Sequence, residues 1–346
     1  MRLCIIVNTL DPPDVGESNF HFAASAASRG HEVSMASAGG FAFGADEVPR
    51  LRSRSLPQGA ALDAEGALAH VRSAPSRWLE IEDLDALLLR NNPFVQKPWA
   101  RDIVFRFASL ARRRGVVVWN EPRGLFHAAD KLYLLELPAT TRPPTLVTRN
   151  VAEIEGFIEA HGDVVVKPLG GSGGKNVFGV RNGSKHNLEA ILETVRRDGY
   201  VVVQEYVPAA VEGDTRLILL EGEPIEVDGK IAAVRRVRSA EDLRSNVHAG
   251  GSAVRAEVTD GMLEVARAIG PRLVADGLHW VGLDLAGDLL LEVNVFAPGG
   301  VRAAGEFEDR DFLSVVVQKL ERAVQRGVPF EGPARPDQGT FHRGML

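Results

Sequence analysis

The sequence predicts an α/β protein whose N-terminal part is a doubly wound parallel sheet and whose C-terminal part is α+β. Its 346 residues exceed one ordinary hydrophobic core and fit two or three packed domains. The first third alternates apolar strand-like runs with helix-like segments, which is typical of parallel sheets. After residue 200 strand-like runs follow one another closely, which indicates antiparallel strands.

Periodicity locates the N-terminal elements. Trp99, Ile103, Phe107 and Leu110 recur at helical spacing, and Gly115 ends that helix. The aperiodic stretch Arg52–Ala60 is predicted to be a surface loop. The expected strands are Leu3–Val7, Glu32–Ala36, Ala86–Leu89 and Val116–Trp119, and the expected helices are Phe20–Ser28 and Trp99–Leu110.

The composition shifts near Asn120, and a proline-rich link runs from Pro138 to Pro144. We therefore expect four parts: residues 1–121, 122–200, 201–326 and a polar tail, 327–346. The helices expected beyond residue 121 are Lys131–Leu135, Glu153–Ala160, a helix ending at Arg197, and Asp260–Asp276. The expected strands are Val164–Lys167, Val177–Val180, Val201–Glu205, Arg216–Leu220, Pro224–Asp228, Val281–Leu285 and Leu289–Val295, with Val201–Glu205, Arg216–Leu220 and Pro224–Asp228 in one antiparallel sheet.

Composition excludes several partners. The net charge of −6 gives no reason to expect nucleic acid or an anionic membrane as a partner. No apolar stretch approaches the ~20 residues that span a bilayer, and the N-terminus lacks the pattern of a signal peptide. We expect a cytoplasmic protein. Cys4 is the one cysteine, in an apolar run, and is predicted to be an inert buried thiol.

A glycine-rich turn is the strongest local signal. An apolar strand delivers Lys167, the turn Gly170–Gly174 follows, and another strand begins near Val177. Glycines let backbone N–H groups crowd around phosphate oxygens, and a lysine adds positive charge. The spacing is not that of a P-loop. A flexible β-hairpin turn is the alternative interpretation.

The last two expected strands carry a second signal. Glu292 and Asn294 are two residues apart and face the same side of one strand, and a short turn places Asp284 opposite them. Three oxygen-bearing side chains among apolar neighbours favour a bound cation, and Mg²⁺ prefers oxygen ligands near phosphates. A solvent-facing polar strand face is the alternative.

Two weaker signals lie between these. Arg216 occupies a strand, and Arg235, Arg236, Arg238 and Arg244 follow in or beside a loop; arginine forks suit phosphate and carboxylate, although a solvated loop also carries arginines. The strand Val201–Val207 ends in polar residues that could edge a purine ring or simply end a strand.

In this order the four signals resemble the ATP-grasp superfamily and, more closely, bacterial glutathione synthetase, from Arg2 to about Gln325. The resemblance implies an ATP-grasp fold of two α+β subdomains after the N-terminal domain. The motifs that carry it are Pro144–Asn150, the Lys167 strand with its glycine turn, Asp214-Thr215-Arg216, Gly222-Glu223-Pro224, Arg244-Ser245-Asn246 with Ala249-Gly250-Gly251, and Val281–Asp284 with Glu292–Val295.

The resemblance also implies residue roles. Lys131 and Lys167 would hold the ATP phosphates. The mobile loop would comprise Gly171, Ser172, Gly173 and Gly174. Gln204, Glu205, Tyr206 and Val207 would form the adenine hinge, with Asp214 at the ribose. Arg216, Arg236 and Arg244 would surround the transferred phosphoryl group, beside Asn246, Gly250 and Gly251. Asp284, Glu292 and Asn294 would ligate Mg²⁺, with Mn²⁺ as a substitute, and Ser18 and Arg90 would lie near the thiol-peptide substrate.

The implied activity is ATP-dependent joining of γ-glutamylcysteine to glycine through an acylphosphate, in a homo-oligomer (a dimer or tetramer). The alternatives are an ATP-grasp ligase for another acid or amine and a non-catalytic nucleotide-binding regulator. We also expect the Arg238–Gly251 segment to be a lid.

The chain departs from the family after Asn294, where the family usually carries hydroxyl residues. Here the run continues through Phe296 to Gly299 and Gly300. We expect the backbone N–H groups of Gly299, Gly300 and Val301 to hold the carboxylate of the amine substrate. Neutral drift in a turn is the alternative.

Overall fold

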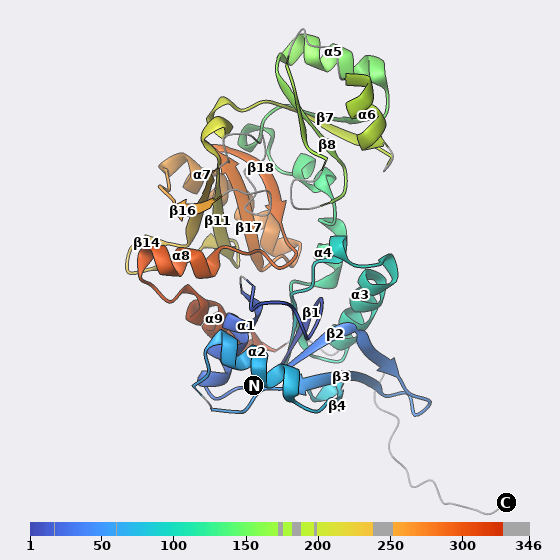
Figure 1. Ribbon diagram of the computed structural model, residues 1–346, viewed down its shortest axis with the longest axis vertical. Helices are drawn as coiled ribbons and strands as arrows, with labels where there is room; N and C mark the ends of the chain where they lie inside the picture. The colour runs from blue at the N-terminus through green and yellow to red at the C-terminus, as the bar shows by residue number, and fades with distance from the viewer. Residues whose placement is uncertain are drawn as a thin grey trace, which may run out of the picture.

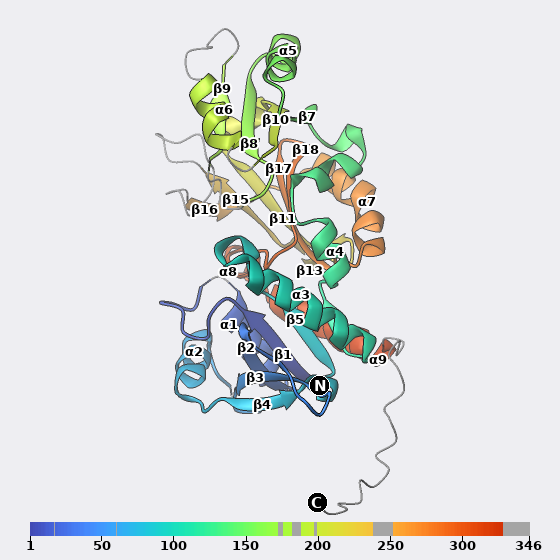
Figure 2. The same cartoon turned by 90° about the vertical axis from the view of Figure 1, so that its right-hand side faces the viewer.

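A computed structural model describes residues 1–16, 18–59, 61–171, 176–181, 188–196, 199–237 and 252–327. Figures 1 and 2 show three lobes in a row: the N-terminal domain at one end, the sheet that contains β11 and β17 in the middle, and a small lobe with α5 and α6 at the other end. The chain passes from the first lobe to the third, returns to the middle one, where α8 packs, and ends its described part with α9 against the first.

The N-terminal sheet has the strand order β4-β3-β2-β1-β5-β6. Its strands are β1 (Arg2–Val7), β2 (Glu32–Phe43), β3 (Pro49–Ser55), β4 (Arg77–Glu80), β5 (Ala86–Leu89) and β6 (Val117–Trp119). The four strands β2, β1, β5 and β6 run parallel to one another. At one edge β3 pairs antiparallel with β2, and β4 pairs antiparallel with β3. The predicted parallel sheet is therefore confirmed for four strands and extended by two antiparallel ones.

Helices cover both faces of this sheet, as the doubly wound prediction requires. Leu3, Ile5 and Val7 face α1 (Asn19–Ser28) and α2 (Ala64–Ser73) in one core cluster. Cys4 and Ile6 face α3 (Pro98–Arg113) in the other. Cys4 is buried, as predicted, and burial raises the pKa of its thiol to about 12, which disfavours the reactive thiolate.

The predicted surface loop Arg52–Ala60 was wrong over its first part, which belongs to β3. Leu51 and Ser53 are buried on β3 and alternate with three arginines at positions 50, 52 and 54. The alternation has the period of a strand, but a buried serine in an inward position conceals it from hydrophobicity alone.

The small lobe is a four-stranded sheet in the order β7-β10-β8-β9, with α5 (Val151–His161) and α6 (Leu188–Arg196) packed on it. Its strands are β7 (Thr145–Thr148), β8 (Val164–Pro168), β9 (Phe178–Val180) and β10 (Val201–Glu205). We predicted that Val201–Glu205 shares a sheet with Arg216–Leu220, and this was wrong. That strand pairs with β7 and β8, so the small lobe extends past the boundary expected at residue 200.

The middle sheet has the order β16-β15-β11-β17-β18, with β12 paired to β11. Its strands are β11 (Asp214–Leu220), β12 (Glu223–Pro224), β15 (Ala233–Val237), β16 (Ser252–Arg255), β17 (Trp280–Ala286) and β18 (Leu289–Asn294). The expected strand Pro224–Asp228 is split: its first residue ends β12, and β13 (Glu226–Val227) pairs with β14 (Lys230–Ile231) in a separate ribbon. Helix α7 (Asp260–Ala275) packs Val265 and Ile269 against Leu217 and Leu283 of this sheet.

Short helical segments join the lobes. Helix α4 (Pro122–His127) follows the N-terminal domain, and the helix expected at Lys131–Leu135 is a 3₁₀ helix, η3 (Lys131–Glu136). The segments η4 (Ala139–Thr141) and η6 (Pro208–Glu212) also lie in connections between lobes, whereas η1 (Ile81–Asp83) and η2 (Pro93–Val95) lie within the N-terminal domain.

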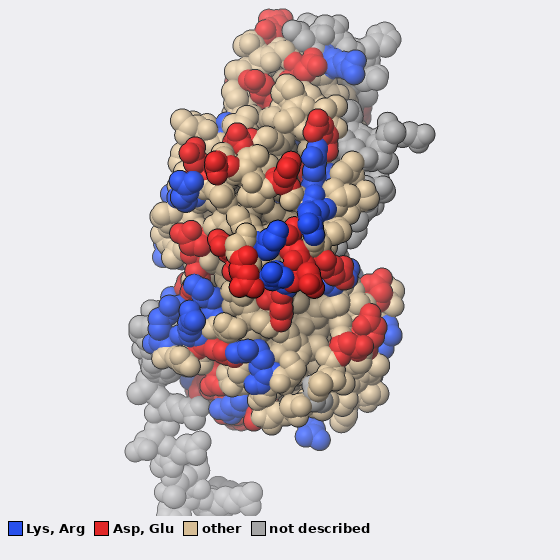
Figure 3. All heavy atoms as spheres, turned by 90° about the vertical axis from the view of Figure 1, so that its left-hand side faces the viewer, with Lys and Arg blue, Asp and Glu red and all other residues tan. Residues whose placement is uncertain are grey.

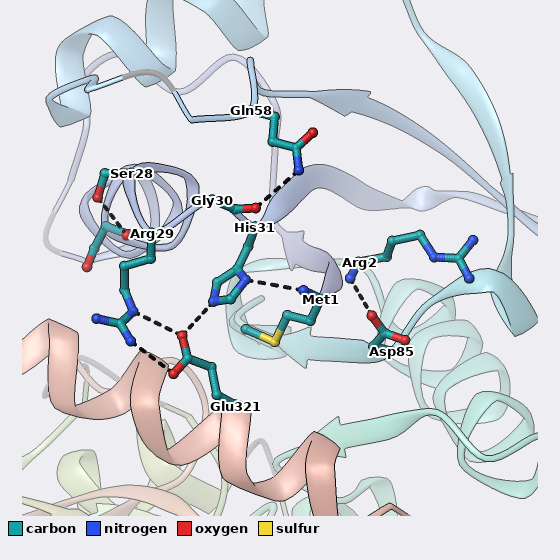
Figure 4. Close-up of polar contacts among 10 residues, drawn as sticks. Met1, Arg2, Ser28, Arg29, Gly30, His31, Gln58, Asp85 and Glu321 are labelled. Atoms are coloured by element: carbon teal, nitrogen blue, oxygen red, sulfur yellow. Dashed lines mark hydrogen bonds and ion pairs between the residues drawn. The ribbon is translucent and has the colours of Figure 1, made fainter.

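Helix α8 (Val301–Glu308) packs on β15 and β16 of the middle sheet, and α9 (Phe312–Arg326) returns to α1 of the N-terminal domain. Glu321 on α9 accepts hydrogen bonds from Arg29 at 3.0 and 2.9 Å and contacts Nε2 of His31 at 2.7 Å, while Nδ1 of His31 lies 3.2 Å from the amino group of Met1 (Figure 4). These contacts attach α9 to the N-terminal domain. Within the described residues, no helix is long and apolar enough to cross a membrane.

Candidate active site

One face of the middle sheet gathers the charged residues that the sequence singled out. Residues directly opposite in an antiparallel pair share a face, and Asp214 lies opposite Arg236, Arg216 opposite Asp284, and Asp284 opposite Glu292. The other face is apolar and packs against α7. The charged face is polar around Asp284, whereas Ile218, Leu220 and Trp280, farther along the same face, are buried in a core cluster with α8 and α9.

Asp284 is the centre of this face and is 3% exposed. Its Oδ1 accepts from Arg216 Nε at 2.7 Å, and its Oδ2 accepts from Arg216 Nη2 at 2.8 Å and from Arg236 Nη2 at 2.7 Å. Burial by itself would raise the pKa of Asp284, but the two guanidinium groups hold it well below its usual range. The carboxylate is therefore ionised and held in one orientation.

Asp214 joins the same network rather than standing free. It is 4% exposed and accepts hydrogen bonds from Arg236, and the preceding Gly213 makes this approach possible. At φ +106° a Cβ on Gly213 would lie 2.0 Å from the Arg236 carbonyl oxygen. A ribose contact by Asp214, as predicted, would require part of this ion pair to open.

The predicted metal ligands converge as expected. Asn294 lies opposite Gly282, two residues from the Asp284–Glu292 pair, and the register shifts beside Asp284. The part of the chain that the structure describes holds no cluster of three or more His, Cys, Asp or Glu residues fit for a metal. Two carboxylates and an amide suit Mg²⁺, which usually takes one or two protein carboxylates together with substrate phosphates.

Two lysines lie near this polar face, Lys131 at the start of η3 and Lys167 on β8 of the small lobe. Lys167 Nζ donates to Gln204 Oε1 at 2.6 Å, and Lys131 Nζ donates to the Gly171 carbonyl at 3.4 Å. Burial lowers the pKa of Lys167 to about 8, the charge of Glu292 opposes this shift, and Lys131 adds to it. Lys167 thus lies within electrostatic range of both Lys131 and the metal-ligand set, which fits phosphates between the lobes.

The expected adenine hinge begins in the last two residues of β10, Gln204 and Glu205, and continues to Val207. Gln204 is 2% exposed, and its Nε2 donates to Thr145 Oγ1 at 3.2 Å, which completes a chain from Lys167. Glu205 contacts His161 at 2.9 Å, and the Tyr206 N–H donates to the Asp163 carbonyl at 2.8 Å. Val207 packs with Ala210 and Ala286 in the cluster between the lobes.

Ser18 and Arg90 lie together in the N-terminal domain, where the carboxyl ends of parallel strands form the usual ligand edge. Arg90 is 4% exposed, and its Nε donates to Asn19 Oδ1 at 3.1 Å. Burial lowers its pKa to about 9. Ser18 Oγ is buried at the start of α1 and has no hydrogen-bond partner among the described atoms. A polar ligand would satisfy this hydroxyl.

The run after Asn294 differs in part from expectation. Gly300 begins α8 in the left-handed region, at φ +102°. Phe296 packs edge-on against Phe94 and parallel to Phe105, both of the N-terminal domain. Arg302 forms an ion pair with Glu306 one turn along α8, so its charge is directed to that neighbour.

Seven of the predicted site residues lie outside the described residues: Ser172, Gly173, Gly174, Arg244, Asn246, Gly250 and Gly251. The lid predicted at 238–251 lies outside them as well.

Sequence reasoning missed Asn120, which lies directly after β6. It is 4% exposed, and its side chain bonds Trp280 and Val295 of the middle sheet. A polar residue just after a buried strand was a signal of this position, but we interpreted it only as a change in composition.

The models of two sequence families together match most of the chain. Residues 1–125 match the family described as prokaryotic glutathione synthetase, N-terminal domain, and residues 130–309 match prokaryotic glutathione synthetase, ATP-grasp domain. The chain belongs to the prokaryotic glutathione synthetase family.

Curated relatives agree with this membership. A glutathione synthetase of Synechocystis sp. is 32% identical over 328 residues, which cover 93% of this chain and 99% of that protein. One from Vibrio parahaemolyticus is 29% identical over 338 residues, covering 94% of this chain and 99% of the relative.

Solved structures show the same fold at low sequence identity. The D-cycloserine synthetase DcsG has a TM-score of 0.61 at 16% identity and covers 92% of this chain and 100% of its own. The ATP-grasp ligase PsnB, in complex with Mg, ADP and a precursor variant, has a TM-score of 0.57 at 20% identity. The match covers 93% of this chain and 98% of the PsnB chain. The ATP-grasp fold predicted from the resemblance is confirmed.

This protein of the glutathione synthetase family is an ATP-dependent C–N ligase that acts on small molecules. The non-catalytic regulator is therefore set aside.

On the face that Figure 3 shows, basic and acidic residues lie side by side in a band across the middle of the molecule.

Proposed function

We propose that this ligase joins γ-glutamylcysteine to glycine and that the reaction takes place on the polar face of the middle sheet. The observation that carries the proposal is the Asp284 network, in which one buried carboxylate meets Arg216 and Arg236 beside Glu292. A carboxylate bordered by guanidinium groups suits a site that must hold phosphoryl groups and metal together.

The chemistry has two steps. A carboxylate oxygen of the dipeptide attacks the γ-phosphorus of ATP, the bond to the bridging oxygen breaks, and an acylphosphate and ADP form. The amine nitrogen then attacks the acyl carbon, the tetrahedral intermediate expels inorganic phosphate, and the nitrogen loses a proton as the amide forms. Positioning and charge neutralisation supply most of the catalysis of such transfers.

The described residues divide these tasks. Lys131 on η3 and Lys167 on β8 would hold the phosphates, and Arg216 and Arg236 would neutralise charge on the transferred group. Asp284, Glu292 and Asn294 would hold Mg²⁺, for which Mn²⁺ should substitute. When bound, the metal acts as a Lewis acid on phosphoryl oxygens.

The two organic substrates would occupy the junction of the N-terminal domain and the middle sheet. The unpaired Ser18 hydroxyl and the buried Arg90 guanidinium suit a carboxylate of the acid substrate. The backbone at Gly299 and Gly300 would receive the carboxylate of the amine substrate. Glycine is the preferred amine, and another small amino acid or amine is the second candidate.

The test is product analysis with ATP and Mg²⁺ over a panel of acids and amines, with product mass and phosphate release measured. We expect glutathione from γ-glutamylcysteine and glycine, with the highest kcat/KM for this pair. A higher kcat/KM for a different acid or amine would show that the chain is an ATP-grasp ligase with another substrate.

The homo-oligomer, a dimer or tetramer, and the cytoplasmic location stay predictions. Light scattering after size exclusion would measure the mass of the assembly.

A further inference from the structure

The N-terminal domain contacts the segment that follows Asn294, the proposed metal ligand. This segment, Val295–Gly300, connects β18 to α8 and carries the expected amine site. Residues from the first 121 positions contact it at three points, although they belong to a different lobe. The most complete of these contacts is made by Asn120.

The Asn120 side chain uses both of its N–H donors and its oxygen on two strand ends. Its Oδ1 accepts from the Trp280 N–H at 2.7 Å, and its Nδ2 donates to the carbonyls of Trp280 at 2.8 Å and Val295 at 3.0 Å. A side-chain amide offers two N–H donors and one carbonyl oxygen, so both donors and the acceptor are engaged.

These bonds lie where the β17–β18 ladder stops. The last paired residues are Gly282 and Asn294, Trp280 begins β17, and Val295 follows β18. Asn120 therefore takes the place of the next rung and joins the two strand ends through a side chain. Because the position is 4% exposed, water cannot readily replace these bonds.

Two further contacts hold the rest of the segment. Arg90 Nη2 donates to the Pro298 carbonyl at 3.2 Å, and the Phe296 ring packs between Phe94 and Phe105. The segment is thus attached to the N-terminal domain at three of its first four residues.

We propose that Asn120 is a positioning residue that sets the place of Asn294 relative to Asp284 and Glu292. The proposal rests on the proposed function, in which these three residues bind the metal. Residues that orient metal ligands typically change metal affinity or activity by roughly 10–100-fold when they are removed. Asn120 touches neither substrate nor metal and acts through the strand ends.

The experiment compares Asn120→Ala and Asn120→Asp with the wild-type chain. Free Mn²⁺ is measured by electron paramagnetic resonance in the presence of ADP, and ADP binding is measured separately without metal. We expect Mn²⁺ affinity and kcat to fall by about 10-fold or more. ADP affinity without metal should change less than about twofold, because the lysines proposed to hold the phosphates lie on η3 and β8 and not on the strand ends that Asn120 joins. Asn120→Asp should fall at least as far, since it presents a carboxylate oxygen to two carbonyls.

Asn150→Ala is the matched control. Asn150 also bonds backbone through its side chain, as the N-cap of α5, but it lies in the small lobe. We expect it to lower Tm without changing Mn²⁺ affinity. Unchanged Mn²⁺ affinity and kcat in folded Asn120→Ala would overturn the positioning role. If the alanine variant does not fold, the Asp variant carries the same test.

Failure of the proposed function gives different results. If the wild-type chain binds Mn²⁺ with ADP but ligates no tested pair, the reaction is wrong and the affinity comparison still decides the role of Asn120. If the wild-type chain binds no Mn²⁺ with ADP, the metal assignment and the positioning role both fall. Faster amide exchange at Trp280 in Asn120→Ala would then show that the contact is structural.

Discussion

Replacing Asp284 by asparagine should destabilise the protein strongly even without any ligand. The carboxylate accepts three hydrogen bonds from Arg216 and Arg236 at 2.7–2.8 Å while 3% exposed. Asparagine keeps one acceptor oxygen and turns an NH₂ group toward a guanidinium donor. Breaking a buried ion pair on one side costs about 3–5 kcal/mol. Because Arg236 keeps Asp214, we expect the lower end, ~3 kcal/mol.

For a chain of 346 residues that melts as one unit, this free energy corresponds to a fall in Tm of roughly 4 °C. Thermal melts followed by circular dichroism in EDTA, without nucleotide, isolate the contribution of the fold. The matched control is Asp46→Asn, which breaks a similar fork with Arg50 at an exposed site and should leave Tm nearly unchanged.

The pH dependence of the same difference provides a second check. The folded pKa of Asp284 is depressed, so its stabilisation is fully present above its unfolded pKa of about 3.9 and is lost as the pH falls toward the folded value. The difference in Tm between wild type and Asp284→Asn should therefore be constant from about pH 8 to 5 and shrink below about pH 4. A variant that melts within about 2 °C of wild type at pH 7 would refute this account of the network.

Three further predictions concern single residues. Glu292→Gln should leave the fold intact and lower kcat by about 100-fold or more, because a bound metal contributes several kcal/mol; near-normal turnover would remove Glu292 from the metal set. ADP affinity should fall as the pH rises through about 8, where Lys167 loses its proton. In calorimetric titrations Lys167→Arg should abolish this pH dependence. A wild-type ADP affinity that is constant from pH 7 to 9 would contradict the prediction. Gly300→Ala should lower stability by ~1–2 kcal/mol in urea titrations, since it forces an L-residue to φ +102° with Cβ 3.0 Å from Val234 Cγ2. The control Gly156→Ala, in α5 with open space around it, should be neutral or stabilising, and equal effects of the two would exclude backbone strain.

Much of the local structure was determined by the sequence alone. The apolar run Leu3–Val7 is a strand in any environment that buries both of its faces, and the spacing of Asp284, Glu292 and Asn294 places them on one face of a hairpin because side chains alternate with period two. The family motifs lie on these elements, so fold and reaction class followed from them.

Tertiary structure decided which elements meet. Val201–Glu205 is equally apolar in any sheet, and only its pairing with β7 and β8 assigns it to the small lobe. Asp214 became the partner of Arg236 because β11 and β15 are adjacent, and Asn120 reached Val295 across 175 positions of sequence. Such contacts depend on long-range register and packing, which no local pattern encodes, and they place the groups that orient the site.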